Sequence, residues 1–196
     1  MVSGVVLSFC FSLYSLFRGG LYVFIWAFLA ALFTVGVGFL VHEVCHKLTA
    51  QRFGLMAMYK MWEVGLILAL ALSLATMGRF VFAAPGAVLI SAPAYWYEVI
   101  PTQRQRGLIA LSGPLSNLGL SLVFASLVLF APIDSFLSLV GRMGFVVNLW
   151  LAAFNLIPIP PMDGHKVFSW NILLWVLVAF AAWGPLVLYL QGVVAL

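Results

Sequence analysis

Long stretches of apolar side chains alternate with short polar breaks along the whole 196-residue chain. About 20 apolar residues in a helix cross the roughly 30 Å of hydrocarbon in a bilayer, and several of the stretches reach or approach that length. The stretches cover residues 5–17, 21–50, 62–82, 108–131, 135–157 and 167–196. The pattern predicts an all-α polytopic membrane protein, folded as a single domain over 1–196, with about five to six transmembrane helices.

Two of these stretches are short for a crossing. Residues 5–17 are too few for an untilted span, and they favour a helix although their Val, Phe and Tyr residues also suit a strand. In 62–82 the uncharged core between Glu63 and Arg79 extends over roughly 22 Å at about 1.5 Å per residue. Neither length supports an ordinary crossing.

A different pattern occupies residues 79–91, where β-forming residues stand on both sides of the turn dipeptide Pro85-Gly86. This arrangement predicts a small membrane-associated β-hairpin or an extended edge strand. An ordinary interfacial turn is the alternative. Residues 92–106 follow with two prolines, three aromatic residues and two arginines, a composition typical of a loop at the membrane interface.

Composition supports the membrane class, since 65% of the residues are hydrophobic and only 7% are charged. The net charge of +4 is scattered; it suits anionic lipid headgroups and offers no footprint for nucleic acid. Both cysteines lie within apolar stretches, which argues against a disulfide framework. Lys47 lies near the end of the second stretch, and Arg52 and Lys60 follow it, so the positive-inside tendency places this end near the cytosol in a multi-pass protein of the cell membrane.

The end of the second stretch carries His42-Glu43-Val44-Cys45-His46. Positions i and i+4 share one face of a helix, so His42 and His46 can bind one metal ion together, while Glu43 points slightly off that axis towards a water at the metal. Polar groups at membrane depth are costly unless something compensates them. Interfacial histidines that flank a helix end are the alternative, but the spacing matches the zinc-protease pattern HExxH.

A catalytic zinc site commonly has three protein ligands, and few residues here can supply the third. Glu63 and Glu98 sit beside tryptophans at the membrane boundary, and Asp134 lies in a tight turn. Asp163 stands in an irregular, proline-rich, apolar setting where an unpaired carboxylate is costly. His165 competes for the role, but the polar boundary begins directly after it. We therefore interpret Asp163 as the third ligand and His165 as a neighbouring or surface residue.

Two motifs together resemble those of a known family. The stretch 42–46, His-Glu-Val-Cys-His, and the stretch 155–164, Asn-Leu-Ile-Pro-Ile-Pro-Pro-Met-Asp-Gly, resemble the HExxH and NxxPxxxLDG motifs of the site-2 protease family of intramembrane zinc metalloproteases. The stretch 112–117, Ser-Gly-Pro-Leu-Ser-Asn, is similar to that family's Gly-Pro-x-x-Asn helix start. Met162 stands where leucine is usual, and His165 stands where a small residue or arginine is usual.

The resemblance implies roles for individual residues. His42, His46 and Asp163 would be the ligands of one catalytic Zn²⁺ ion, and Glu43 would be the general base. Asn155 would help to hold the substrate or the tetrahedral intermediate. The resemblance further implies a prokaryotic, archaeal-type member without an inserted PDZ domain, because the interval between the first motif and the Gly-Pro-x-x-Asn stretch is short and apolar.

By the same resemblance, the chain is expected to hydrolyse peptide bonds within or near transmembrane segments of membrane-protein substrates, in regulated intramembrane proteolysis. Its partners would be a transmembrane protein substrate and the lipid bilayer, and the sequence leaves its oligomeric state open. A helical substrate must unwind before its carbonyl groups are accessible. An edge strand within 80–91 could hold the unwound chain by adding it to a sheet.

Other membrane metalloproteins fit the sequence less well. Zinc proteases that process prenylated proteins share HExxH but take a glutamate from a downstream helix as third ligand, and no glutamate is suitably placed here. A metal transporter or a non-catalytic metal-binding membrane protein has no use for a base beside its ligands, so Glu43 argues against this alternative. Lipid hydroxylases with two irons need many more histidines than the three of this chain.

The order of the motifs predicts how often the chain crosses the membrane. Asp163 must reach the depth of the two histidines at the cytosolic end, so the stretch before it descends towards the cytosol and 108–131 ascends from it. Between the motif helix and 108–131 the chain must then cross an even number of times. Segment 61–82 is the candidate helix of this interval, so we predict that it is re-entrant or interfacial, with Lys60 and Arg106 on the same side.

Overall fold

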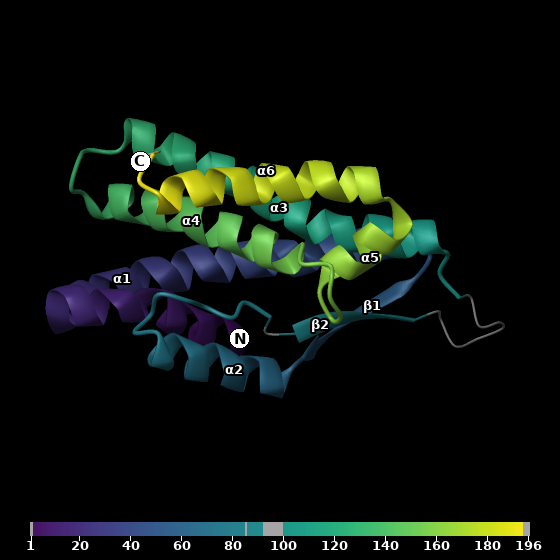
Figure 1. Ribbon diagram of the computed structural model, residues 1–196, viewed down its shortest axis with the longest axis horizontal. Helices are drawn as coiled ribbons and strands as arrows, with labels where there is room; N and C mark the ends of the chain where they lie inside the picture. Colours follow the sequence, from purple (N-terminus) through teal and green to yellow (C-terminus); the bar gives the residue numbers. More distant parts are fainter. Residues whose placement is uncertain (1, 85, 92–99, 194–196) are drawn as a thin grey trace.

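The computed structural model describes residues 2–84, 86–91 and 100–193 of the chain. These residues form helices and two short strands (Figure 1), in the order α1 (Val2–Arg52), β1 (Met56–Met61), α2 (Glu63–Ala75), β2 (Gly86–Ser91), α3 (Gln103–Phe130), α4 (Phe136–Asn155), α5 (Asp163–Trp170) and α6 (Ile172–Leu190). The predicted helical architecture is thereby confirmed. Within the described residues, four helices (α1, α3, α4 and α6) are long and apolar enough to cross a membrane. The expected total of about five to six crossings stays a prediction.

Helix α1 consists of two arms joined at Gly20, whose φ of 72° is rarely adopted by residues with a side chain. The arms fold back on each other (Figure 1), and Ser8 Oγ of the first arm donates a hydrogen bond to the Ala31 carbonyl of the second at 3.2 Å. The first apolar stretch, 5–17, is helical as predicted. The second arm carries the HExxH motif near its end.

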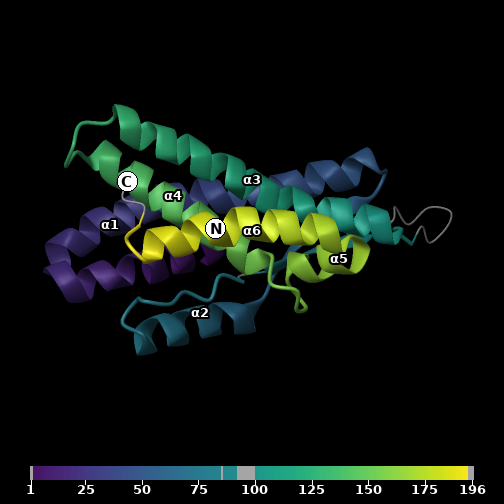
Figure 2. The ribbon, with the colours of Figure 1, turned by 45° about the horizontal axis from the view of Figure 1, so that its top comes forward.

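Strands β1 and β2 form an antiparallel pair in which Met61 lies opposite Gly86. The chain between these two residues contains α2, so it leaves the strand pair and returns to the same place (Figures 1 and 2). On the way α2 packs along the first arm of α1, where Ser73 Oγ donates to the Cys10 carbonyl at 3.1 Å. That segment 61–82 is re-entrant or interfacial stays a prediction.

The predicted local hairpin around the Pro-Gly dipeptide is not confirmed. Its second half is a strand, but that strand pairs with β1, whereas residues 80–84 form no strand. Burial accounts for the difference, because Val81 and Ala83 lie in the core and Trp150 Nε1 of α4 donates to the Val81 carbonyl at 2.8 Å. The first half is therefore held by α4 and not by a neighbouring strand. Pro85 lies outside the described residues.

Helix α4 ends at Asn155 because prolines at 158, 160 and 161 prevent a regular helix beyond it. The irregular segment that follows leads directly into α5, whose first residue is Asp163. Helix α5 contacts α3, which in turn packs on α1. The break after α4 thus brings Asp163 back to the helix that carries the two histidines.

Candidate metal centre

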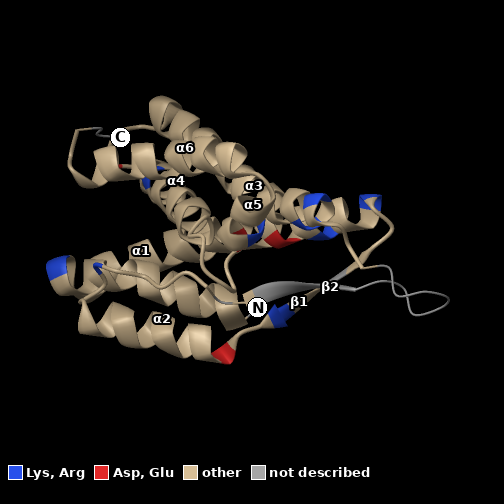
Figure 3. Ribbon diagram, turned by 45° about the vertical axis from the view of Figure 1, so that its right-hand side comes forward, with Lys and Arg blue, Asp and Glu red and all other residues tan. Residues whose placement is uncertain are grey.

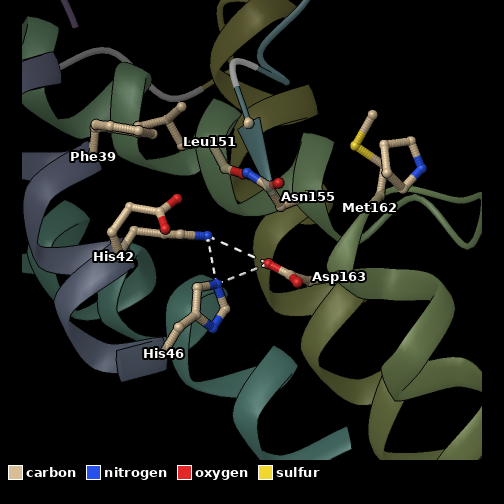
Figure 4. A pocket seen from close by; sticks show the side chains of 10 residues that line it. Phe39, His42, His46, Leu151, Asn155, Met162 and Asp163 are labelled. Atoms are coloured by element: carbon tan, nitrogen blue, oxygen red, sulfur yellow. Dashed lines mark hydrogen bonds and ion pairs between the residues drawn. The ribbon is translucent and has the colours of Figure 1, made fainter. Parts of the chain in front are cut away.

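The three residues expected to bind a metal meet inside the molecule (Figure 4). His42 and His46 come from adjacent turns of the second arm of α1, Asp163 begins α5, and all three side chains are buried. His42 Nε2 lies 2.9 Å from His46 Nε2 and 3.4 Å from Asp163 Oδ2, and His46 Nε2 lies 2.9 Å from Asp163 Oδ2. Neighbouring ligands of tetrahedral zinc, with bonds of about 2.0–2.1 Å, are about 3.3–3.4 Å apart. The triangle is therefore close to the size that zinc requires.

Hydrogen bonds on the far side of each imidazole fix how the histidines face this triangle. His46 Nδ1 lies 2.7 Å from the carbonyl oxygen of Ile109, and His42 Nδ1 lies 2.6 Å from Asn117 Oδ1. A backbone carbonyl can only accept, so His46 Nδ1 carries the hydrogen and its Nε2 presents a lone pair. An electron-pair donor of this kind, facing a second imidazole and a carboxylate, is the arrangement that a bound cation satisfies.

Gly113 of α3 keeps the space beside the two imidazoles free. A Cβ atom at this position would lie 2.6 Å from His42 Nε2 and closer still to His46 Nε2. Any side chain there would take the place in which an ion bound by both nitrogens must sit. The donor set and this space together fit a metal ion.

The second oxygen of the Asp163 carboxylate has its own partner. Lys166 Nζ, one turn along α5, donates to Asp163 Oδ1 at 3.1 Å, while Oδ2 faces the histidines. Burial acts to raise the pKa of Asp163, and the neighbouring Lys166 ammonium acts to lower it. A carboxylate must be ionised to bind a metal, and the lysine beside Asp163 favours that form.

A small cavity of about 20 Å³ adjoins the ligand triangle, enough for one water molecule. Glu43, Asn155, Gly86 and Met162 contribute to its lining. Glu43 Oε2 is buried and has no hydrogen-bond partner within the described part of the chain. Since a buried carboxylate oxygen without a donor is costly, this atom is suited to accept a proton or hydrogen bond from a molecule that enters the cavity.

Two curated proteins are similar to this chain. "Putative zinc metalloprotease MJ0611" of Methanocaldococcus jannaschii is 40% identical over 163 residues, which cover 83% of this chain and 79% of that protein. The chain belongs to this zinc metalloprotease family. "Putative zinc metalloprotease YwhC" of Bacillus subtilis is 28% identical over 155 residues, 69% of this chain and 66% of that protein. No family model and no solved structure matches the chain.

Zinc is the cofactor of this metalloprotease, since the family is one of zinc enzymes and three residues that can bind a metal converge in the structure. The structure also brings Asn155, the last residue of α4, to the cavity, where its Nδ2 donates to the Leu151 carbonyl at 2.9 Å (Figure 4). His165 is exposed on α5, in keeping with the surface interpretation. Glu98 lies outside the described residues.

Several residues around the metalloprotease site were assigned no role from the sequence. Lys166 supports Asp163, Gly113 keeps the ion's space free, and Asn148 contacts Asn117 behind His42. A signal existed for Asn148, because a polar residue inside an apolar helix usually faces the interior of a bundle and marks a functional region. Gly113 is the glycine of the Gly-Pro-x-x-Asn stretch, but its place beside the two imidazoles depends on how α3 packs against α1.

Proposed function

We propose that this metalloprotease is an intramembrane endopeptidase of the site-2 protease type, prokaryotic and archaeal-type, without a PDZ domain. It would hydrolyse peptide bonds within or near transmembrane segments of membrane-protein substrates, in regulated intramembrane proteolysis. The observation that carries the proposal is the position of the ligand triangle, with Glu43 beside it, inside a bundle of apolar helices long enough to cross a membrane. A soluble zinc protease has no need of such surroundings.

Each residue has a role that follows from its position. His42, His46 and Asp163 would hold the zinc ion, which when bound supplies Lewis acidity to a water molecule and to the substrate carbonyl. Glu43, whose Oε2 lies at the cavity without a hydrogen-bond partner among the described residues, would take a proton from the attacking water and return it to the leaving amine. Asn155 donates a hydrogen bond from its side chain to the substrate backbone in the same cavity.

The substrate chain must reach a cavity that has room for only a water molecule, so a segment that lines it has to move. Strand β2 begins at this cavity with Gly86. Its one partner among the described strands is β1, which leaves its other edge able to take up an added strand. An unwound substrate segment could bind there by β-augmentation, which would present its carbonyl groups to the zinc centre.

The distribution of basic residues supports a cytoplasmic active site in a multi-pass protein of the cell membrane. Figure 3 shows these residues at the two ends of the bundle. The end with the start of α3, strand β1 and helix α5 holds the site (Figure 1), and these elements and the end of α1 carry Lys47, Arg52, Lys60, Arg104, Arg106 and Lys166. The bend of α1, the chain after α2 and the start of α4 lie at the opposite end and carry Arg18, Arg79 and Arg142. The cytoplasmic side of membrane proteins is the one richer in lysine and arginine.

A metal transporter would need successive binding sites along a path. The part of the chain that the structure describes shows one cluster of three ligand residues. The protease is therefore the function that the geometry supports best.

The decisive experiment separates metal binding from chemistry. Glu43→Gln removes the base but no ligand, so the purified variant should retain zinc at the wild-type stoichiometry while cleavage of a single-span membrane protein falls by about 100- to 10,000-fold. Glu63→Gln, at the exposed start of α2, is the matched control and should retain both properties. A Glu43→Gln enzyme that cleaves like the wild type would refute the assigned mechanism.

A further inference from the structure

A chain of hydrogen bonds connects three helices behind the zinc site. Asn148 of α4 and Asn117 of α3 are fully buried, and His42 of α1 is nearly so. Asn117 Nδ2 donates to Asn148 Oδ1 at 2.9 Å, and Asn117 Oδ1 lies 2.6 Å from His42 Nδ1. The relay Asn148–Asn117–His42 thus runs from the middle of α4 to a metal ligand, and the proposed chemistry makes no use of its first member.

The ends of the relay fix the direction of every hydrogen bond in it. Asn148 Nδ2 donates to the Gly144 carbonyl at 2.8 Å, so its Oδ1 must face Asn117. Asn117 then meets two acceptors with its nitrogen, Asn148 Oδ1 and the Gly38 carbonyl at 3.1 Å. Its oxygen is left for His42, and because this oxygen can only accept, His42 Nδ1 must be the donor.

The consequence falls on the metal-binding nitrogen of His42. With the hydrogen held on Nδ1, Nε2 carries a lone pair and points into the ligand triangle. His46 reaches the same state through the backbone carbonyl of Ile109, which no side-chain substitution removes. The two histidines therefore differ: His46 Nδ1 has a close backbone partner, with Ser112 Oγ farther away at 3.5 Å, whereas His42 Nδ1 is held by the side chain of Asn117.

The packing of α1 against α4 allows for this relay. A Cβ atom on Gly38, one turn before His42, would lie 2.6 Å from Asn148 Oδ1. A larger residue at this position would push Asn148 away from Asn117. Gly38 thus supplies both the space for Asn148 and a carbonyl acceptor for Asn117.

We propose that Asn148 and Asn117 act in series as positioning residues, which hold His42 in its Nδ1–H form with Nε2 directed at the zinc ion. This inference rests on the zinc site of the proposed function but not on proteolysis. It predicts that a substitution at Asn148, which touches no metal ligand, alters metal binding through Asn117.

The test measures metal binding by the full-length protein in detergent, with zinc affinity from competition with a chelator and coordination geometry from the visible spectrum of bound Co²⁺. Asn148→Leu should weaken zinc binding by about 10- to 100-fold and change the Co²⁺ spectrum. Asn148→Asp should restore both, because a protonated aspartic acid can donate to the Gly144 carbonyl and accept from Asn117. Ser121→Ala is the matched control on α3, since Ser121 is buried and, among the described residues, its hydroxyl bonds only to a carbonyl of its own helix.

The outcomes separate the relay from the function on which it rests. Wild-type affinity and spectrum in Asn148→Leu would overturn the relay, whereas a wild-type protein that binds no zinc would overturn the proposed function. If Asn148→Leu does not fold, ¹⁵N spectra of the metal-free wild-type protein decide the question. The same spectra of metal-free Asn148→Asp serve as the comparison. The hydrogen of His42 should be found on Nδ1, and its presence on Nε2 would refute the proposal.

Discussion

Gly113 offers a direct test of where the metal ion lies. Gly113→Ala adds one methyl group at a position where the Cβ atom would be 2.6 Å from His42 Nε2 and nearer still to His46 Nε2. Non-bonded carbon and nitrogen atoms need about 3.5 Å. Either α3 or the two imidazoles must therefore move by about 1 Å to relieve the contact.

A shift of this size is large for a metal site. Zinc–ligand distances tolerate a deviation of about 0.2 Å, so a movement of about 1 Å by either histidine removes it from productive coordination. Loss of a hydrogen bond that merely orients a ligand costs about 10- to 100-fold in affinity. We expect Gly113→Ala to weaken zinc binding by at least about 100-fold, the upper end of this range, which corresponds to about 2.7 kcal/mol of binding free energy.

The assay is zinc affinity by chelator competition, with cleavage of a membrane-protein substrate measured alongside. Gly119→Ala is the matched control, because Gly119 lies on the same helix, is exposed and has no atom within 4 Å of the added methyl group. It should bind zinc and cleave like the wild type. A Gly113→Ala protein with wild-type zinc affinity would show that the ion does not occupy the space between the histidines and α3.

Three further predictions address the third ligand, its support and the topology. Asp163→Ala should lower zinc affinity and cleavage by more than about 100-fold, the cost of losing an orienting hydrogen bond. His165→Ala should retain both properties. The reverse pattern would identify His165 as the ligand. Lys166→Met should weaken zinc binding by about 10- to 100-fold because Asp163 Oδ1 loses its partner, and Lys166→Arg should restore the affinity. Equal zinc affinities of Lys166→Met and the wild type would show that the ion pair does not position the carboxylate. Lys60→Cys and Arg106→Cys, each in a background without the native cysteines, should react with a membrane-impermeant thiol reagent from the same face of sealed vesicles. Labelling from opposite faces would mean that segment 61–82 crosses the membrane.

The parts of this metalloprotease that the sequence determines are those governed by local geometry. The spacing of His42 and His46 places them on one face of a helix whatever the rest of the chain does, and apolar stretches of sufficient length form helices in the structure. Asp163 could be singled out because the chain has few carboxylates and only this one follows a proline-rich break in an apolar setting. The structure brings it to the two histidines.

Contacts between segments distant along the chain were decided only by the tertiary structure. β-Forming residues on both sides of a Pro-Gly dipeptide predicted a hairpin, but strand propensity does not specify a partner, and β2 pairs with β1 across α2 while Val81 is held by α4. Asn117 was visible as part of a motif, yet its bonds to His42 and Asn148 depend on three helices packing together. Helix spacing is a property of adjacent turns, whereas such a relay exists only once the bundle has formed.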